Sequence, residues 1–291
     1  MAWTNYHSHT NYCDGDADPE IYILAAIEEG LLAYGFSSHA PVPFDCKWTM
    51  NKQRIGDYSR YIDFLQHKYR DKIEIYKSLE IDYIPGVIGV SHPSIQKLNL
   101  DYSIGSIHFI DKFPDGMPWE IDGNHWKFAT GLLEIFQGDI KRVITRYYQL
   151  TREMVQKDCP DIIGHLDKIK IQNSFFEYFD ETESWYKREI EQTLSTIAQS
   201  DAIVEVNTRG LYKRKTNSTY PSPWILERIH DLNIPVTINS DSHRPEEITM
   251  GFEETAKLLD DIGFKRVRAF VNGYWQDFDL NRNGLAIPVA V

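Results

Sequence analysis

The sequence predicts a single α/β domain in which about seven strand-helix units form a barrel. Three observations lead to this fold class. Short apolar runs of strand-forming residues alternate with longer helical stretches over the whole chain. The 291 residues, 42% of them hydrophobic, are enough to bury one large core. Polar side chains that can bind metal or phosphate follow each predicted strand, and in a barrel the strand ends share one face.

The predicted elements follow one another in regular strand-helix order. The apolar runs predict strands at about 2–6, 34–38, 73–79, 102–107, 161–164, 202–207 and 235–240. The patterns between them predict helices at about 19–29, 56–69, 89–98, 131–157, 183–200, 223–232 and 246–261. Pro19 and Pro223 suit the first turn of a helix, and Pro245 precedes the last one. This order indicates parallel strands, in either an open sheet or a closed barrel.

The chemically active residues are concentrated where these strands end. His7 and His9 follow the first strand, and their i, i+2 spacing on an extended segment puts both imidazoles on one side. An open sheet would spread the strand ends over a wide front, whereas a barrel gathers them, so the barrel is favoured. The later candidates are Asp14, His39, Glu80, His108, His165, Asn207, Arg209, Asp241 and His243.

Imidazole is the commonest metal ligand in proteins, and the pattern of histidines points to a metal site. A single histidine after a strand is usually an ordinary hydrogen-bonded residue. Six of the ten histidines, however, stand at the same point of successive units. The other four, His67, His92, His125 and His230, lie in predicted helices or in an irregular insertion, and we expect no ligand role for them.

The composition limits the classes of partner that the protein could bind and the compartment in which we expect it. A net charge of −12 argues against nucleic acid as the main partner, but it is compatible with a small phosphorylated substrate. The first 20 residues are polar and acidic, and no apolar run near either end could span a bilayer. We therefore expect a cytoplasmic protein without a membrane partner. Cys13, Cys46 and Cys159 show no pairing pattern, which favours reduced thiols. The oligomeric state stays open.

These residues resemble the PHP (polymerase and histidinol phosphatase) family of metal-dependent phosphoesterases over nearly the whole chain. The resemblance rests on His7-x-His9-Thr10 with Asp14, Ser38-His39-Ala40-Pro41, Leu79-Glu80, Ser106-Ile107-His108, Gly164-His165-Leu166-Asp167 and Ser240-Asp241-Ser242-His243. Within the family, the chain is most similar to the histidinol-phosphatase branch. That similarity is carried by Cys13-Asp14-Gly15, Gly105-Ser106-Ile107-His108-Phe109 and Glu205-Val206-Asn207-Thr208-Arg209-Gly210.

The resemblance implies a distorted (β/α)7 TIM-like barrel that holds three transition-metal ions. Mixed imidazole and carboxylate ligands suit zinc, iron or manganese. Asp14 stands where some relatives carry a histidine. Carried onto this chain, the ligands of the first ion would be His7, His9, Glu80 and Asp241, those of the second Glu80, His108 and His165, and those of the third Asp14, His39 and His243. Glu80 would bridge two ions.

The implied activity is hydrolysis of L-histidinol phosphate in histidine biosynthesis, with Glu80 and Asp241 as catalytic metal ligands. Two metal ions about 3.5–4 Å apart stabilise in-line displacement at phosphorus. Arg209 is the first candidate to bind the phosphoryl oxygens, because guanidinium matches phosphate geometry. Asp167 or a metal-bound water would protonate the leaving group. Further candidates for phosphate contact are Lys213, Arg214, Lys215, Arg244 and His108.

An aromatic insertion at 109–128 follows the fourth strand. Loops at this position often cap the mouth of a barrel and shape the choice of substrate. The imidazole of histidinol phosphate could stack on its rings, and its ammonium group could meet Asp115, Glu120 or Asp122. Packing of the insertion on itself is the alternative. The aromatic residues are Phe109, Phe113, Trp119, Trp126 and Phe128.

Other functions remain open at this stage. The same metal site could serve a PHP phosphoesterase for phosphotyrosine, a nucleotide or another small phosphomonoester. Amidohydrolase-type barrels, which cleave C–N bonds, also begin with a His-x-His pair, but they commonly bridge their metals through a lysine where this chain has His108. A binding protein with a structural metal cluster would need closed sites, whereas nine ligands over three ions leave positions open. An exonuclease is disfavoured by the acidic charge.

Overall fold

Two parallel sheets carry the predicted strands. The computed structural model describes residues 2–174 and 177–286. In the first sheet the order is β1-β2-β3, and in the second it is β10-β9-β8-β5-β4. Every neighbouring pair in both sheets is parallel. The strands are β1 (Thr4–Asn5), β2 (Ala33–Phe36), β3 (Glu74–Lys77), β4 (Glu80–Asp82), β5 (Ile104–Ser106), β8 (Ile162–Ile163), β9 (Ile203–Asn207) and β10 (Val236–Asn239).

The mixed α/β architecture and the parallel strands are as predicted, but a closed barrel is not found among the described residues. The predicted strand at 73–79 ends at Lys77, and β4 begins only at Glu80, in the other sheet. Two isolated parallel bridges connect the sheets: His39, beyond β2, pairs with Glu80, and Ser8, beyond β1, pairs with Ser242, beyond β10. The sequence had suggested that Glu80 directly follows a strand, but in the structure it is the first residue of β4.

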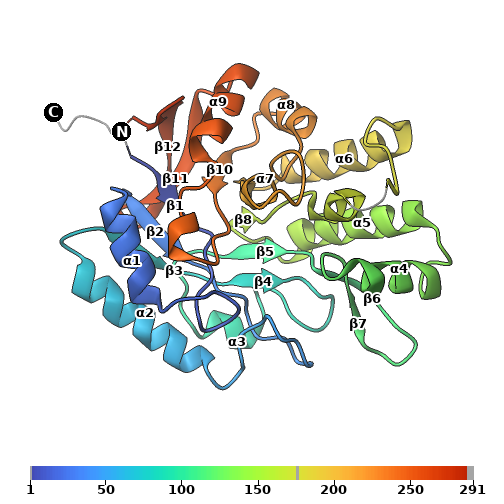
Figure 1. Cartoon of the computed structure of the whole chain (residues 1–291), viewed down its shortest axis with the longest axis horizontal. Coiled ribbons are helices and arrows are strands. Elements are labelled where there is room, and N and C mark those ends of the chain that lie inside the picture. The colour runs from blue at the N-terminus through green and yellow to red at the C-terminus, as the bar shows by residue number, and fades with distance from the viewer. Residues whose placement is uncertain (1, 175–176, 287–291) are drawn as a thin grey trace.

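Helices surround the strands on the outside (Figure 1). Apolar residues recur at helical spacing along each long helix, so one face is buried. On α5, for example, Val143, Tyr147 and Met154 are fully buried. The long helices are α1 (Pro19–Glu28), α2 (Ile55–Tyr69), α4 (His125–Glu134), α5 (Ile140–Lys157), α6 (Ser184–Ile197), α8 (Pro223–Asp231) and α9 (Phe252–Ile262). None of the helices in the described part of the chain is long and apolar enough to cross a lipid bilayer.

Three predicted helices are corrected by the structure. The helix predicted at 131–157 is two helices, because Gln137 and Gly138 adopt positive φ angles and the Asp139 side chain then caps α5. The stretch at 89–98 is helical only over α3 (Pro93–Gln96). The helix predicted at 246–261 is a 3-10 turn, η2 (Pro245–Glu247), followed by α9. A short helix that was not predicted, α7 (Arg209–Tyr212), follows β9.

An antiparallel sheet near the chain ends was also not predicted. It contains β11 (Arg266–Val271), β12 (Tyr274–Asn281) and β13 (Gly284–Leu285). Leu285 pairs with Ala2, so this sheet lies beside the first strand (Figure 1). The buried hydroxyl of Tyr6 donates to the carbonyl of Phe270 and accepts from its N–H. The C-terminal sheet therefore fixes the segment that carries His7 and His9.

The insertion at 109–128 forms a hairpin followed by the start of α4. The hairpin pairs β6 (Phe109–Lys112) with β7 (Pro118–Glu120). Trp119 and Phe128 are buried in the larger of two apolar core clusters, which also includes the buried faces of α5, α6 and α8. The smaller cluster lies between the first sheet and helices α1 and α2.

Candidate metal centre

The nine predicted ligands converge on one place at the strand ends. They come from seven different segments of the chain, spread from His7 to His243. Seven of the nine side chains are buried, and Asp14 is the most exposed. Three overlapping groups have nitrogen and oxygen atoms close enough to share a metal ion: His9, Asp14, His39 and His243; His7, His9 and Asp241; and His39, Glu80 and His108.

Glu80 is at the centre of this cluster. Its Oε2 lies 3.2 Å from Nε2 of His7, 3.5 Å from Nε2 of His9 and 2.9 Å from Nδ1 of His39. Its Oε1 lies 2.8 Å from Nε2 of His165 and 3.7 Å from Nε2 of His108. One carboxylate thus faces five imidazoles, which is the arrangement that a bridging ligand requires.

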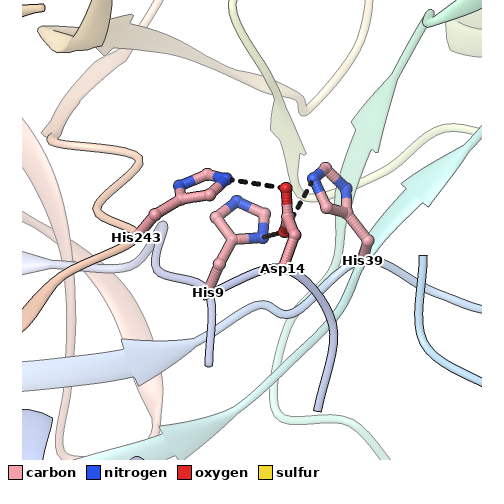
Figure 2. Close-up of side chains that lie close together, drawn as sticks. All are labelled: His9, Asp14, His39 and His243. Atoms are coloured by element: carbon pink, nitrogen blue, oxygen red, sulfur yellow. Dashed lines mark ion pairs between the residues drawn. The ribbon is translucent and has the colours of Figure 1, made fainter. Parts of the chain in front are cut away.

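Asp14, His39 and His243 surround His9 on the outer side of the cluster (Figure 2). Oδ2 of Asp14 is 3.3 Å from Nε2 of His243, and Oδ1 is 3.8 Å from Nε2 of His39. Asp241 closes the inner side, with Oδ1 3.1 Å from Nε2 of His9. The groups that the resemblance implied are therefore neighbours in space, and His9 lies between two of them.

Several buried ring nitrogens in this cluster have no hydrogen-bond partner in the described part of the chain, which suits a site that binds metal ions. His7 Nε2, His9 Nε2, His39 Nδ1 and His165 Nδ1 have no hydrogen-bond partner within the described residues. A buried polar atom without a partner is costly, and native proteins rarely leave one. Here three such nitrogens point at the same carboxylate oxygen of Glu80. A cation between imidazole nitrogens and carboxylates satisfies both kinds of ligand.

The charges in the cluster hold its carboxylates ionised despite burial. Burial opposes the charge of Glu80, yet His7, His39 and His108 hold the pKa of its carboxyl well below the usual range. Burial, together with His243 and His39, lowers the pKa of His9, which keeps that imidazole neutral. Burial opposes the charge of His7, His39 and His108, yet neighbouring carboxylates raise the pKa of all three imidazoles. Metal ions bind ionised carboxylates and neutral imidazoles, so metal binding would displace the protons of these three rings.

Buried acceptors behind the imidazoles orient them. Nδ1 of His7 donates to Oε1 of Glu205 at 2.6 Å, which leaves Nε2 facing the cluster. Nδ1 of His108 donates to Asp82 in the same way, at 3.0 Å. Metal-binding histidines commonly donate their second ring N–H to a carboxylate, which fixes the tautomer. Neither Glu205 nor Asp82 was given a role from the sequence, although an acid inside the apolar run Ile203-Val204-Glu205-Val206 was a usable signal.

The local backbone is shaped to present these ligands. Asp241 and His165 are each the second residue after the end of a strand, and they have positive φ angles of 51° and 23°. Such strain costs of order 1–3 kcal/mol per residue and is typical of functional sites. At Gly15, a Cβ atom would lie 2.4 Å from the backbone of His9. Only glycine therefore lets the loop return Asp14 toward His9.

Three cations share the cavity with the predicted ligands. The cavity has a volume of about 150 Å³ and is lined by all of the predicted ligands except His7 and His9, together with Lys168, Arg209 and Lys215. Nζ of Lys168 is 3.5 Å from Asp122 and 3.9 Å from Asp241. Burial and repulsion from Lys168 and Arg209 lower the pKa of Lys215, as expected where cations gather around space for an anion.

Lys168 was missed from the sequence, while other predicted cations point elsewhere. The N–H of Lys168 donates to the carbonyl of His165, so this turn has the i, i+3 spacing that aligns side chains. Lys213 pairs with Glu247, and Arg244 pairs with Asp16; neither lines the cavity. Arg214 does not line it either. Lys213 and Arg244 are thus held in ion pairs outside the cavity.

Asp167 is not positioned as a proton donor. It is completely buried, its carboxylate is 2.9 Å from Nζ of Lys170, and it accepts a hydrogen bond from the N–H of Ser222. It does not line the cavity. The expectation that Asp167 protonates a leaving group therefore has no support in the geometry, and its role is to connect the turn after β8 to the start of α8.

An aromatic cleft adjoins the metal cavity. It has a volume of about 750 Å³, and Trp48 and Glu120 line both spaces. The Trp48 ring stacks on Phe109, with 5.6 Å between ring centroids, and its edge meets His39 and His108. The hairpin of the insertion and the start of α4 form the other wall. Of the predicted aromatic residues, all but Phe128 line the cleft, namely Phe109, Phe113, Trp119 and Trp126, and Trp126 is 78% exposed.

The sequence model of the PHP domain matches residues 5–209, more than half of the chain. The chain belongs to the PHP family. All of the predicted ligands except Asp241 and His243 lie inside the matched range.

Curated relatives of this PHP chain carry one name. The "Probable histidinol-phosphatase" of Deinococcus radiodurans is 25% identical over 264 residues, which cover 90% of this chain and 94% of the relative. The "Histidinol-phosphatase" of Bacillus subtilis is 23% identical over 263 residues, covering 85% of this chain and 96% of the relative. The similarity thus extends over nearly the full length of both proteins.

A solved structure shares the fold of this PHP chain. It is the histidinol phosphate phosphatase of Lactococcus lactis subsp. lactis, in complex with zinc, L-histidinol and phosphate. The TM-score is 0.69 at 19% sequence identity, and the match covers 94% of this chain and 98% of the other. The structural likeness supports the PHP fold of the chain.

Proposed function

We propose that this chain is a metal-dependent phosphomonoesterase that hydrolyses L-histidinol phosphate to L-histidinol and phosphate, in histidine biosynthesis. The observation that carries the proposal is the joint lining of one cavity by imidazoles, carboxylates and three cations. The first two groups are metal ligands, and Lys168, Arg209 and Lys215 complement a phosphate. The names of the two curated relatives supply the substrate.

The proposed centre takes three ions of zinc, iron or manganese, held by the nine predicted ligands. Such ions act as Lewis acids that activate water and offset negative charge at phosphorus. Glu80 would bridge, because both of its oxygens face imidazoles. Ser106 supports this role by donating to Oε1 of Glu80 at 2.6 Å, and a Cβ at Gly164 would collide with that hydroxyl.

The cations of the chain bind and orient the phosphoryl group in this proposal. The Lys168 ammonium reaches the cavity from the turn after His165, and Lys215 reaches it from the loop after α7. Arg209 donates through Nη1 to the carbonyl of Asp241 at 2.8 Å, so it also stabilises the strained backbone of that residue. Arg209 thus serves two purposes, whereas Lys168 is the cation with fewer structural contacts.

We also propose that the two sheets together form the distorted (β/α)7 barrel, within one domain that comprises the whole chain and carries an insertion at 109–128. The two bridges between the parallel sheets, His39 to Glu80 and Ser8 to Ser242, support this proposal. A cytoplasmic location is part of the proposal, favoured by the three unpaired cysteines.

The experiment that tests the function is a phosphate-release assay on purified protein whose metal content has been measured. L-histidinol phosphate is compared with p-nitrophenyl phosphate, phosphotyrosine, a nucleoside monophosphate and a dinucleotide. We expect kcat/KM for L-histidinol phosphate to exceed the others by at least about a hundredfold, which corresponds to about 2.7 kcal/mol of transition-state discrimination. Equal, weak turnover of all phosphomonoesters would contradict the substrate but not the phosphatase chemistry.

Replacing Glu205 with glutamine tests the support behind the ligands. The Glu205 carboxylate accepts from Nδ1 of His7, the N–H of His165, and the side-chain amides of Asn207 and Asn239. The NH2 group of glutamine is itself a donor, so it would face one of these N–H groups and could not accept its hydrogen bond. We expect metal affinity to fall by about 10- to 100-fold, measured by competition with a chelator. Glu227→Gln, on the exposed side of α8, is the control, and equal affinities in both variants would refute the role of Glu205.

A further inference from the structure

The aromatic cleft has a property that the metal cavity lacks, namely room for the alcohol part of a substrate. The metal cavity, at about 150 Å³, is below the range of about 300–1,000 Å³ that is usual for sites enclosing an organic ligand. The adjoining cleft, at about 750 Å³, is within it. Because Trp48 and Glu120 line both, a phosphomonoester with its phosphate at the metal ligands has its alcohol directed past these two side chains.

The insertion carries four acidic residues, which differ in their exposure and in their partners. Asp122 is engaged with Lys168, at 3.5 Å. Asp115 is exposed at the hairpin turn, where it accepts from the N–H of Met117. Asp111 is exposed on β6 and does not line the cleft. Glu120 is half-buried at the junction of cavity and cleft, and within the described residues it forms no ion pair.

The surroundings of Glu120 suit a cation that also bears a ring. Burial and the neighbouring Asp122 raise the pKa of the Glu120 carboxyl, so a cation beside it would restore its charge. His108, Lys127 and a hydrogen bond with Trp48 act in the opposite direction, but no ion pair with Glu120 forms within the described residues. The cleft beside it presents the stacked rings of Trp48 and Phe109, with Trp126 at the rim. A carboxylate next to exposed aromatic faces is complementary to a positively charged aromatic or heterocyclic group.

We propose that Glu120 is the specificity-determining residue of this site, and that it binds the cationic part of the alcohol while the ring of the substrate lies in the aromatic cleft. This proposal rests on the proposed function. It assigns to Glu120, rather than to Asp115 or Asp122, the recognition of an ammonium group. It also predicts that phosphomonoesters of neutral or acidic alcohols are poor substrates because they leave Glu120 unpaired.

Glu120→Gln tests the assignment, with two substrates and two inhibitors measured on metal-loaded protein. We expect kcat/KM for L-histidinol phosphate to fall by about 30-fold or more, because loss of one partner of a desolvated charge pair is costly. The value for p-nitrophenyl phosphate should stay within about threefold, which also shows that the variant is folded. Inhibition by L-histidinol should weaken by a similar factor, whereas inhibition by inorganic phosphate should not change.

Asp111→Asn is the matched control, a carboxylate-to-amide change on the same hairpin that should leave all four measurements unchanged. Asp115→Asn completes the series. If Asp115→Asn and not Glu120→Gln removes the preference, or if Glu120→Gln lowers activity on both substrates equally, the assignment is wrong. If the wild-type protein itself shows no preference for L-histidinol phosphate, the proposed function fails, and that result is distinct from a wild-type preference that survives in Glu120→Gln.

Discussion

Replacing Glu80 with glutamine is expected to abolish turnover and to lower the metal content of the protein. Glu80 is the carboxylate whose two oxygens face five imidazoles, so no other residue can take its place. The neutral amide would offer one oxygen in place of two and direct an N–H group at a ring nitrogen. We expect kcat to fall by more than about 10³-fold, since the loss of Lewis-acid stabilisation amounts to several kcal/mol.

Metal content should be measured by elemental analysis on the same samples, with at least one ion per chain lost in Glu80→Gln. Glu254→Gln, on the exposed face of α9, is the control for the chemical change alone. The circular dichroism of both variants should match that of the wild type, because the sheets and helices do not depend on this side chain. A Glu80→Gln protein that keeps wild-type turnover and metal content would show that the metal ions bind elsewhere.

Replacing Lys168 with methionine is expected to cause the next largest loss. The ammonium group lies in the cavity, and the methionine side chain preserves most of its apolar volume. We expect kcat/KM for L-histidinol phosphate to fall by about 10²- to 10³-fold, as is usual when a donor to a developing negative charge is removed from a desolvated site. Metal content should not change, because Lys168 is a cation and not a ligand. Arg209 is a less clear target, since its removal would also release the backbone of Asp241.

The control for Lys168 is Lys257→Met, an equivalent change on the exposed face of α9. The two variants should differ in phosphate inhibition as well, with weaker inhibition by inorganic phosphate in Lys168→Met only. If Lys168→Met has wild-type kinetics, phosphate binding must be assigned to Arg209 and Lys215 instead. A parallel loss of metal would instead mean that Lys168 supports the ligands through Asp241.

The site could be predicted from the sequence to the extent that local patterns encode it. His7 and His9 lie at i, i+2 just beyond one strand, and Asp241 and His243 lie at the same spacing just beyond another, so each pair could be recognised by its spacing. Parallel strands bring such ends to one face, which made the convergence of nine residues predictable without knowledge of any contact. The family resemblance rested on the same positions.

Other features depend on contacts between distant segments, and the sequence does not reveal these. The break of the predicted 131–157 helix comes from positive φ angles at Gln137 and Gly138, yet only the glycine was visible as a signal. Lys168 enters the cavity because of a single turn, whereas Lys213 is withdrawn from it by Glu247. The β-strands at the C-terminus pack on Tyr6, and nothing in their own sequence reveals that partner.

Because Ser8 pairs with Ser242, the metal centre can be completed only when both ends of the chain have been synthesised. The Asn5 side chain donates to Ser240, a residue 235 positions away, beside the same bridge. During synthesis the first ligands leave the ribosome long before Asp241 and His243 exist, so a partial chain holds at most an incomplete set. We therefore expect metal loading to be a post-translational event of the finished polypeptide. Contacts this far apart in sequence also give a high contact order, which is associated with slow folding.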